Sequence, residues 1–427
     1  MLRQAGLDER AARASISIEI SIDRGDKMPT DKVSVPADEL ANRIVKLQKA
    51  LAAREMDGAL ISQKTDLFYF GATSQQGWLY VPAAGKAILM IFKEFERARQ
   101  ESPLEEIVSI VNNKKIPAVL DMYGYPSPSV LGLELDVLPT NLYFQYCSLF
   151  KNSKIEDISY EIRLIRAVKS EFEILKLRAA AGLSDKVAAK VPELLKIGKT
   201  EVTLAGELEG YARSLGHQGI VRMRMWGSEL FYGHLLSGDG AAIPSYLASP
   251  TGGTGVSNVI GQGAGFRKIK SNEPVLVDYV FALDGYISDH ARIFSIGRLS
   301  RELEAAHQAM LEIQNEIKSQ AKPGTHTGEL YEFMVSLAEK KGYAENFMGV
   351  GERRIRFTGH GVGLELDEFP FIAKGQQLAL EAGMVIALEP KTIFPGRGVV
   401  GIENTHLVTG NGLESLSSFS DEITVLH

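Results

Sequence analysis

The sequence predicts a mixed α/β (α+β) protein, and three observations support this. Short apolar runs alternate with helical patterns up to about residue 160. The segment 160–215 is rich in Ala, Leu, Lys and Glu, which is typical of helices. From residue 220 onwards, glycine-rich loops and hairpin-like runs surround two helical stretches, near 300–321 and 327–341. Such alternation of strands and helices favours mixed sheets covered by helices.

The first part of the chain opens with an amphipathic helix over about 37–55, because Leu40, Ile44, Leu47 and Leu51 recur at helical spacing. Short apolar runs follow: GALISQ, LFYFGA, WLYVPA, KAILMIF, IPAVLDM and YFQYCSLF. AILMIF, bounded by Lys86 and Lys93, is typical of a core strand. This region is therefore expected to be an α/β domain with a mixed sheet.

A domain boundary is expected near 160–170, giving domains at 38–165 and 166–427. The second domain begins with a helix whose start is marked by Ser170 and Glu173, a capping-box pattern. Residues 1–27 carry charges throughout and lack an apolar core, so they do not resemble a secretory signal. Residues 1–37 are predicted to be a disordered extension or an artefact of the gene model, with Met28 as an alternative start.

Composition excludes several classes of protein. The net charge of −6 gives no basic surface, so nucleic acid is not an expected partner. The longest apolar runs are shorter than the 18 or so residues that a membrane span requires, so no membrane partner is expected. The single cysteine, Cys147, excludes an internal disulfide and a cysteine-rich metal site, and it fits the reducing cytoplasm.

The run VDYVFALDGYISD (277–289) places aspartates in a segment otherwise suited to a core. Asp284-Gly285 is a strong two-residue hairpin signal, and we interpret Asp284 as a turn residue rather than a ligand. A turn there pairs Val280 with Asp289 and places Asp278 and Asp289 on one face as diagonal neighbours. Since a buried carboxylate is costly unless compensated, a positive charge is expected opposite them.

A second hairpin repeats this arrangement. In MVIALEPKTIFPGRGVVGIENTHLV (384–408), a turn centred on Gly396 places Glu389 directly opposite Glu403. Directly opposed like charges destabilise a sheet. One such pair alone fits a solvated face. Two pairs in apolar hairpins, with no Lys or Arg expected on the same face, favour a metal site.

His360, in FTGHGVGLELDEFP, lies between glycines that leave room for close approach of an ion. A lone histidine fits a structural role, but beside four carboxylates a ligand role is the better interpretation. Four carboxylates carry −4, which two divalent cations would balance. Oxygen ligands with one imidazole suit Mn²⁺, Co²⁺, Fe²⁺ or Zn²⁺, and paired ions lie about 3.5–4 Å apart.

These residues resemble the pita-bread metallopeptidase family, which includes methionine aminopeptidase, aminopeptidase P, prolidase and the non-peptidase creatinase. The matching motifs are Asp278 and Asp289 in DGYISDHARIF, His360 in GHGVGL, Glu389 in ALEP and Glu403 in GIENTHLVT. The resemblance covers roughly 38–427 and implies a creatinase-type N-terminal domain followed by a C-terminal pita-bread domain. It further implies a homodimeric enzyme in which a metal-bridged hydroxide attacks a peptide carbonyl and Glu389 transfers the proton to the leaving nitrogen.

Four positions depart from the family pattern, because Ser245, Arg356 and Asp367 stand where histidines are usual and Gly401 where an arginine is usual. The metal ligands are thus intact while the surrounding pocket is rebuilt. Arg356 and Asp367, with Ser245, are candidate substrate-binding residues.

Other pocket candidates have structural alternatives. His234 is a candidate catalytic residue or a plain structural histidine. Arg222 and Arg224 alternate on one face, where we favour a solvated role over carboxylate binding. The glycine-rich run 249–265 lacks the ending of a phosphate loop and is interpreted as a flexible edge of the pocket.

Three functions remain open. The first is a dinuclear Xaa-Pro dipeptidase or aminopeptidase P-like enzyme acting on small peptides, favoured by the complete ligand set. The second is a non-peptidase enzyme on the same fold that acts on a small amidine, amide or sulfonium compound, favoured by the rebuilt pocket. The third is a binding protein without catalysis, which the five retained ligands disfavour.

Overall fold

The computed structural model describes residues 35–230, 232–247 and 249–427. The predicted N-terminal extension therefore lies almost wholly outside the described residues. None of the described helices combines the length and the apolar character that crossing a membrane requires.

The first sheet has the strand order β4-β3-β2-β1-β5-β6, with antiparallel pairs joining β1, β2 and β3 and parallel pairs elsewhere. Its strands are β1 (Gly58–Ile61), β2 (Gly77–Pro82), β3 (Ile88–Ile91), β4 (Glu106–Ser109), β5 (Val130–Leu133) and β6 (Lys154–Asp157). The mixed sheet predicted for this region is confirmed.

The helices of this region are α1 (Ala37–Ala53), which precedes β1, and, between the strands, α2 (Lys64–Gly71), α3 (Phe95–Glu101), η1 (Asn113–Lys115), α4 (Ile116–Met122) and α5 (Thr140–Leu149). The α1 helix follows the prediction and buries Leu40, Ile44, Leu47 and Leu51. Of the short apolar runs, LFYFGA, IPAVLDM and YFQYCSLF fall largely in helices, and the others supply strands. Runs of this length carry too little periodicity to separate the two.

Three helices occupy the stretch predicted to be helical: α6 (Ser159–Ala167), α7 (Glu171–Leu194) and α8 (Glu201–Ser214). The predicted capping box is present at the start of α7, where Ser170 accepts from the Glu173 amide and Glu173 accepts from the Ser170 amide. Satisfying two free amides in this way fixes where the helix begins.

The large sheet has the order β11-β10-β12-β15-β9-β8-β7, with β16 added to β15 and β17 to β9. These strands are β7 (Gly233–Ser237), β8 (Val275–Leu283), β9 (Tyr286–Ile296), β10 (Phe357–Gly361), β11 (Glu368–Ala373), β12 (Val385–Leu388), β15 (Glu403–Thr409), β16 (Gly412–Ser415) and β17 (Thr424–Leu426). A separate two-stranded ribbon consists of β13 (Lys391–Phe394) and β14 (Gly398–Gly401). The remaining elements are α9 (Gly238–Ala241), α10 (Arg301–Gln320), α11 (Thr327–Lys340) and η2 (Gly351–Arg353).

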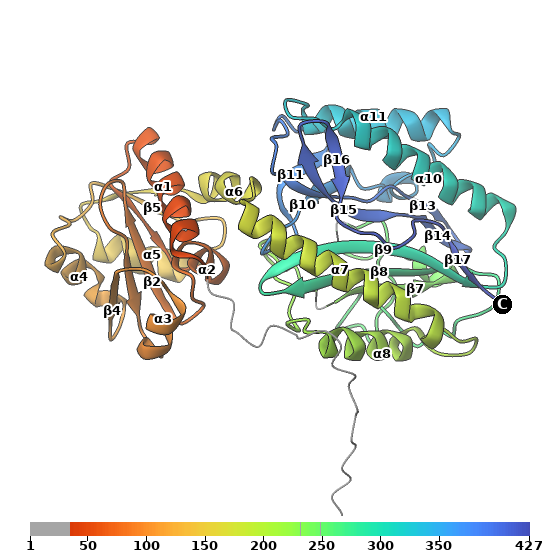
Figure 1. The fold of residues 1–427 in the computed structure, drawn as a ribbon, viewed down its shortest axis with the longest axis horizontal. Helices are drawn as coiled ribbons and strands as arrows, with labels where there is room; N and C mark the ends of the chain where they lie inside the picture. The colour runs from red at the N-terminus through yellow and green to blue at the C-terminus, as the bar shows by residue number, and fades with distance from the viewer. Residues whose placement is uncertain (1–34, 231, 248) are drawn as a thin grey trace, which may run out of the picture. The chain divides into compact units, whose positions relative to one another are not determined.

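Helix α7 runs along β8 and β9 (Figure 1). Alternate residues of β8, namely Val275, Val277, Tyr279 and Phe281, pack against side chains of α7 and α8. Because successive side chains of a strand point to opposite faces, Asp278 and Val280 face away from these helices. The face of the sheet opposite α7 and α8 is therefore the one that carries the predicted ligands.

Both predicted hairpins have the expected register. In β8–β9, Val280 pairs with Asp289 and Asp278 with Ala291. Asp284 has a positive φ of 54° and Gly285 one of 93°, as a tight turn that follows the strand twist requires. In the second hairpin, Lys391 pairs with Gly401 and Leu388 with Asn404, a register that places Glu389 and Glu403 opposite each other.

Candidate metal centre

The sheet aligns candidate ligand residues in one row across four strands. His234 on β7 pairs with Asp278 on β8, Asp278 pairs with Ala291 on β9, and Ala291 pairs with Glu403 on β15. Paired residues of neighbouring strands present their side chains on the same face. The two hairpins thus bring together carboxylates that are 125 positions apart in the chain, since Glu403 and Asp278 flank the small Ala291.

Asp289, His360 and Glu403 form a compact cluster. Ligand atoms of the three residues lie within 4.8 Å of one another. Nε2 of His360 is 3.6 Å from Oδ2 of Asp289 and 3.9 Å from Oε1 of Glu403. All three residues are buried. Two carboxylates and one imidazole around one point are a donor set that suits a divalent cation, so the residues present fit a metal ion.

Two backbone carbonyl groups fix the orientation of the His360 ring. Nδ1 lies 3.0 Å from the carbonyl oxygen of Leu366 and 3.1 Å from that of Gly361. A carbonyl only accepts, so Nδ1 carries the proton and donates. In its neutral form, which metal binding requires, the ring directs the lone pair of Nε2 towards Asp289 and Glu403.

Lys391 lies inside the predicted site. Its ammonium nitrogen is 3.0 Å from Oδ2 of Asp278, 3.0 Å from Oε2 of Glu389 and 2.6 Å from Oε2 of Glu403. The lysine side chain is 1% exposed. The expectation that no Lys or Arg shares the face of these carboxylates is therefore wrong. Lys391 follows Glu389 by two positions, so strand alternation returns it to the same side.

The electrostatics of the cluster follow from burial and close charges. Burial and the neighbouring Asp278 carboxylate raise the pKa of Asp289 to about 7. Burial and the Asp289 carboxylate also raise the pKa of Glu403 well above its usual value. Burial alone would lower the pKa of Lys391, but the carboxylates of Asp278, Glu389 and Glu403 outweigh it and hold that pKa well above normal. The carboxylates thus repel one another, which is the electrostatic condition that a bound cation relieves.

A cavity of about 650 Å³ opens onto the cluster. Its walls are largely apolar, with Met223, Met225, Trp226, Leu247, Phe357 and Phe371 among the lining residues. Its volume lies in the range of small-molecule and short-peptide sites, and a few charged groups at one end of an apolar cavity are typical of a binding site.

Three of the four predicted pocket residues outside the ligand set line this cavity: His234, Arg356 and Asp367. Nε2 of His234 is 3.3 Å from Oε1 of Gln262, and burial lowers the pKa of His234, which keeps its ring neutral. Asp367 lies 3.7 Å from Nδ1 of His360. Ser245 is engaged elsewhere, since its hydroxyl donates to the carbonyl of Gly261. These placements leave the roles of all four residues as predictions.

Arg224 differs from the prediction. It is buried and pairs with Asp66 at 2.7 Å and Asp136 at 2.7 Å, so its interpretation as a solvated residue is wrong. Arg166 joins the same network through Asp66 at 2.6 Å and Glu365 at 2.8 Å. Sequence patterns give no signal for partners so distant along the chain. Two buried arginines thus tie the β1–β6 region to the loop that follows His360.

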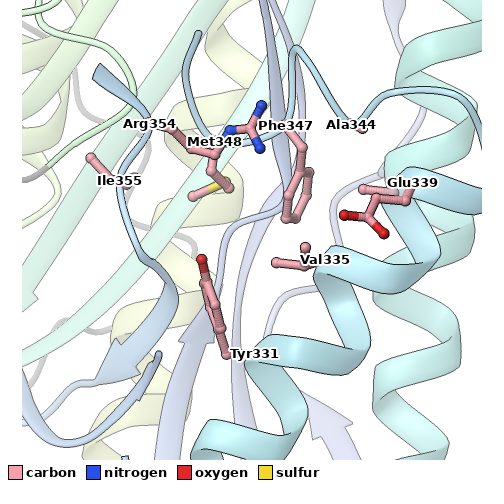
Figure 2. A pocket seen from close by; sticks show the side chains of 9 residues that line it. Tyr331, Val335, Glu339, Ala344, Phe347, Met348, Arg354 and Ile355 are labelled. Carbon is pink, nitrogen blue, oxygen red and sulfur yellow. The ribbon is translucent and has the colours of Figure 1, made fainter. Parts of the chain in front are cut away.

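A second cavity, of about 40 Å³, lies beside α11 (Figure 2). Figure 2 shows Tyr331 and Val335 of α11 facing Phe347 and Met348 across it. The space is too small for a peptide. It adjoins the candidate metal centre through the backbone, because the Met348 amide donates to the Lys391 carbonyl.

Comparisons with known proteins agree with this geometry. The sequence profile described as "Metallopeptidase family M24" matches residues 175–410, and the profile "Creatinase/Prolidase N-terminal domain" matches residues 43–168. The chain is 27% identical to an Xaa-Pro dipeptidase of Pyrococcus furiosus, over 90% of this chain and all of that protein. It is 29% identical to an uncharacterised peptidase of Staphylococcus aureus, over 88% of this chain and 99% of that one.

The fold also recurs among solved structures. An Xaa-Pro dipeptidase from Bacillus anthracis superposes with a TM-score of 0.77 at 24% identity, covering 91% of this chain and all of the other. This likeness confirms the predicted fold, a creatinase-type N-terminal domain followed by a pita-bread domain.

Proposed function

Since the chain belongs to metallopeptidase family M24, we propose that it is a metal-dependent Xaa-Pro dipeptidase or aminopeptidase acting on small peptides. The observation that carries the proposal is the cluster of Asp289, His360 and Glu403 at the end of a largely apolar cavity. The names of the relatives support the Xaa-Pro specificity, and they favour a peptidase over an enzyme for amidines or sulfonium compounds.

For the two ions predicted from the sequence, the proposed ligand set is Asp278, Asp289, His360, Glu389 and Glu403. A bound divalent cation supplies Lewis-acid activation of a carbonyl and lowers the pKa of water. His360 contributes a neutral donor fixed by the Leu366 carbonyl. Manganese, cobalt, iron and zinc all suit these donors, and two ions remain the number predicted from the carboxylates alone.

Glu389 is the proposed acid and base of the reaction. Its carboxylate is 6% exposed and lines the cavity, within reach of a peptide nitrogen bound there. Lys391 holds one of its oxygens at 3.0 Å, which leaves the other oxygen to exchange a proton. A carboxylate fixed in this way keeps its orientation through a reaction cycle.

His234 is the second proposed catalytic residue, and Arg356 and Asp367 are the proposed substrate contacts. A neutral His234 offers a hydrogen bond to a peptide carbonyl or amide. Arg356 offers a cation for the carboxylate end of a short peptide. The predicted homodimer and the cytoplasmic location also remain predictions, resting on the resemblance and on the single Cys147.

Hydrolysis of a peptide panel tests the proposal. Metal-free protein is reloaded with Mn²⁺, Co²⁺ or Zn²⁺ and given Xaa-Pro dipeptides, Xaa-Pro tripeptides and matched Xaa-Ala peptides. Metal-dependent cleavage before proline is expected, lowered by about 10²–10³-fold or more in Asp289→Asn. Dipeptides and tripeptides separate a dipeptidase from an aminopeptidase. Bound metal without cleavage of any peptide would contradict the proposal and direct attention to small amides and amidines.

A further inference from the structure

The ammonium group of Lys391 is fully coordinated by carboxylates. An ammonium carries three N–H donors and no acceptor, and Nζ has three carboxylate partners, from Asp278, Glu389 and Glu403, at 2.6–3.0 Å. Lys391 is among the largest fully buried side chains of the described residues. A buried lysine surrounded by three carboxylates occupies the kind of position in which proteins otherwise bind cations.

Glu403 divides the site into two halves. Its Oε2 accepts from Lys391, while its Oε1 faces Nε2 of His360. Asp289 lies on the His360 side, with Oδ2 at 3.6 Å from Nε2. Asp278 lies on the lysine side, with Oδ2 at 3.0 Å from Nζ. One half is thus a compact group of metal-binding atoms, and the other half is already filled by a cation of the chain itself.

The neighbouring strand makes room for the lysine. Gly401 pairs directly with Lys391, and a Cβ at Gly401 would lie 2.6 Å from Cα and 3.1 Å from Cγ of Lys391. A side chain at position 401 is therefore incompatible with this placement. The resemblance expects an arginine at this position, and any such side chain would meet Lys391.

The backbone of Lys391 also contacts Met348. Its carbonyl accepts from the Met348 amide at 3.0 Å, and its own amide lies 3.4 Å from Sδ of Met348. Figure 2 shows Met348 beside Phe347 and Tyr331 at the wall of the small cavity. Contacts on both flanks thus fix the backbone of Lys391 beside the carboxylates.

We propose that Lys391 takes the place of one of the two divalent cations, so that the chain holds a single divalent ion between Asp289, His360 and Glu403. The inference rests on the proposed metal-dependent function and deepens it. The count that predicted two ions balanced four carboxylates without the positive charge of Lys391. A lysine donates hydrogen bonds but has no free orbital for water or a carbonyl, so it supplies charge and orients Glu389 without Lewis-acid chemistry.

Metal stoichiometry and electron paramagnetic resonance of the Mn²⁺-loaded full chain test this inference. Wild-type protein is expected to hold one Mn²⁺ per chain under saturating conditions, with the spectrum of an isolated ion. Lys391→Gly, purified in Mn²⁺, is expected to hold two and to show magnetic coupling, since paired ions lie about 3.5–4 Å apart. Lys391→Met removes the charge but keeps the volume, and it is expected to hold one.

Two matched substitutions locate the ion. Asp289→Asn is expected to lower Mn²⁺ affinity by about 10²-fold, because Asp289 lies in the half that holds the ion. Asp278→Asn makes the same chemical change in the half that Lys391 fills, and it is expected to keep one ion with affinity within about tenfold. The wild-type measurement decides the question even where a variant does not fold.

Each outcome has a distinct meaning. Two coupled Mn²⁺ ions in the wild-type chain would overturn the inference and leave the proposed peptidase intact. One ion without cleavage of any peptide would support the inference and contradict the proposed function. No bound Mn²⁺ would overturn both. One ion lost in Asp278→Asn but retained in Asp289→Asn would overturn the assignment of the two halves.

Discussion

Lys391 and Gly401 lie directly opposite each other in the ribbon formed by β13 and β14. Gly401 has a φ of 150°, in the region that favours glycine, and its added Cβ would lie 2.4 Å from the Pro390 carbonyl oxygen. The placement of Lys391 therefore depends on the absence of a side chain at position 401.

Gly401→Ala should lower the free energy of unfolding by about 2–4 kcal/mol, because backbone strain and overlap with Lys391 add together. Gly396→Ala is the matched control in the same hairpin. Gly396 also has a positive φ, of 75°, but open space where its Cβ would lie. Denaturant unfolding of the two variants measures the difference. Equal losses in both would show that the contact between strands at Lys391 is looser than described.

Arg356→Met should raise the KM for Xaa-Pro dipeptides by about 10-fold or more with kcat little changed, because a charge-assisted hydrogen bond to the substrate carboxylate is lost. Dipeptides with an amidated carboxyl end should show little change. Arg353→Met, in the nearby η2, serves as a control since Arg353 is exposed and does not line the cavity. A loss confined to kcat would exclude a role for Arg356 in carboxylate binding.

Arg166→Met should destabilise the protein by about 3–5 kcal/mol, because it leaves Asp66, Glu365 and Glu368 buried without their shared cation. Arg54→Met removes an arginine that also pairs with two carboxylates, Glu156 and Glu161, but whose side chain is 40% exposed. That control should cost at most about 1 kcal/mol. Thermal and denaturant unfolding of both variants would check the contrast, and similar losses would argue against the buried network.

The protein should lose stability as the pH falls below about 6.5, in part through His217. Nδ1 of His217 accepts from the Gly219 amide and Nε2 lies 3.1 Å from the Val280 carbonyl oxygen, so the ring is held neutral. Burial lowers the pKa of His217 to about 4. Between that value and about 6.5, the unfolded chain binds more protons than the folded one, so stability rises with pH over this range.

For His217 this effect should amount to roughly 1–2 kcal/mol by pH 4.5, after allowance for solvent screening. The measurement is the difference in unfolding free energy between pH 7 and pH 5, compared with the same difference in His217→Gln. The glutamine variant cannot titrate, so its dependence on pH should be shallower whatever its absolute stability. An unchanged slope would mean that other groups account for the acid sensitivity.

Much of the site was predictable because strand register is a local property. The turn at Asp284-Gly285 fixed the partners of Asp278 and Asp289, and the turn near Gly396 fixed those of Glu389 and Glu403. Alternation along a strand then determined which side chains share a face. The same rule applied to Lys391 identifies it as a neighbour of Glu389, so the signal for the buried lysine was present in the sequence.

Contacts between distant segments were not predictable in this way. Arg224 and Asp66 are 158 positions apart, and their ion pair depends on how the elements pack rather than on any local pattern. The short runs that became α2, α4 and α5 illustrate the same limit, since apolar stretches of this length suit either a strand or a helix until the sheet beside them is known.

The row that joins His234, Asp278, Ala291 and Glu403 has an evolutionary consequence. Each candidate ligand on it takes its position from the strand register, so deleting one residue from β8, β9 or β15 would turn the side chains beyond that point to the opposite face. Loops at the rim of the cavity carry no such constraint. Insertions and deletions at the rim can thus alter what the cavity recognises while the row beneath keeps its register, whereas changes of length in the strands cannot.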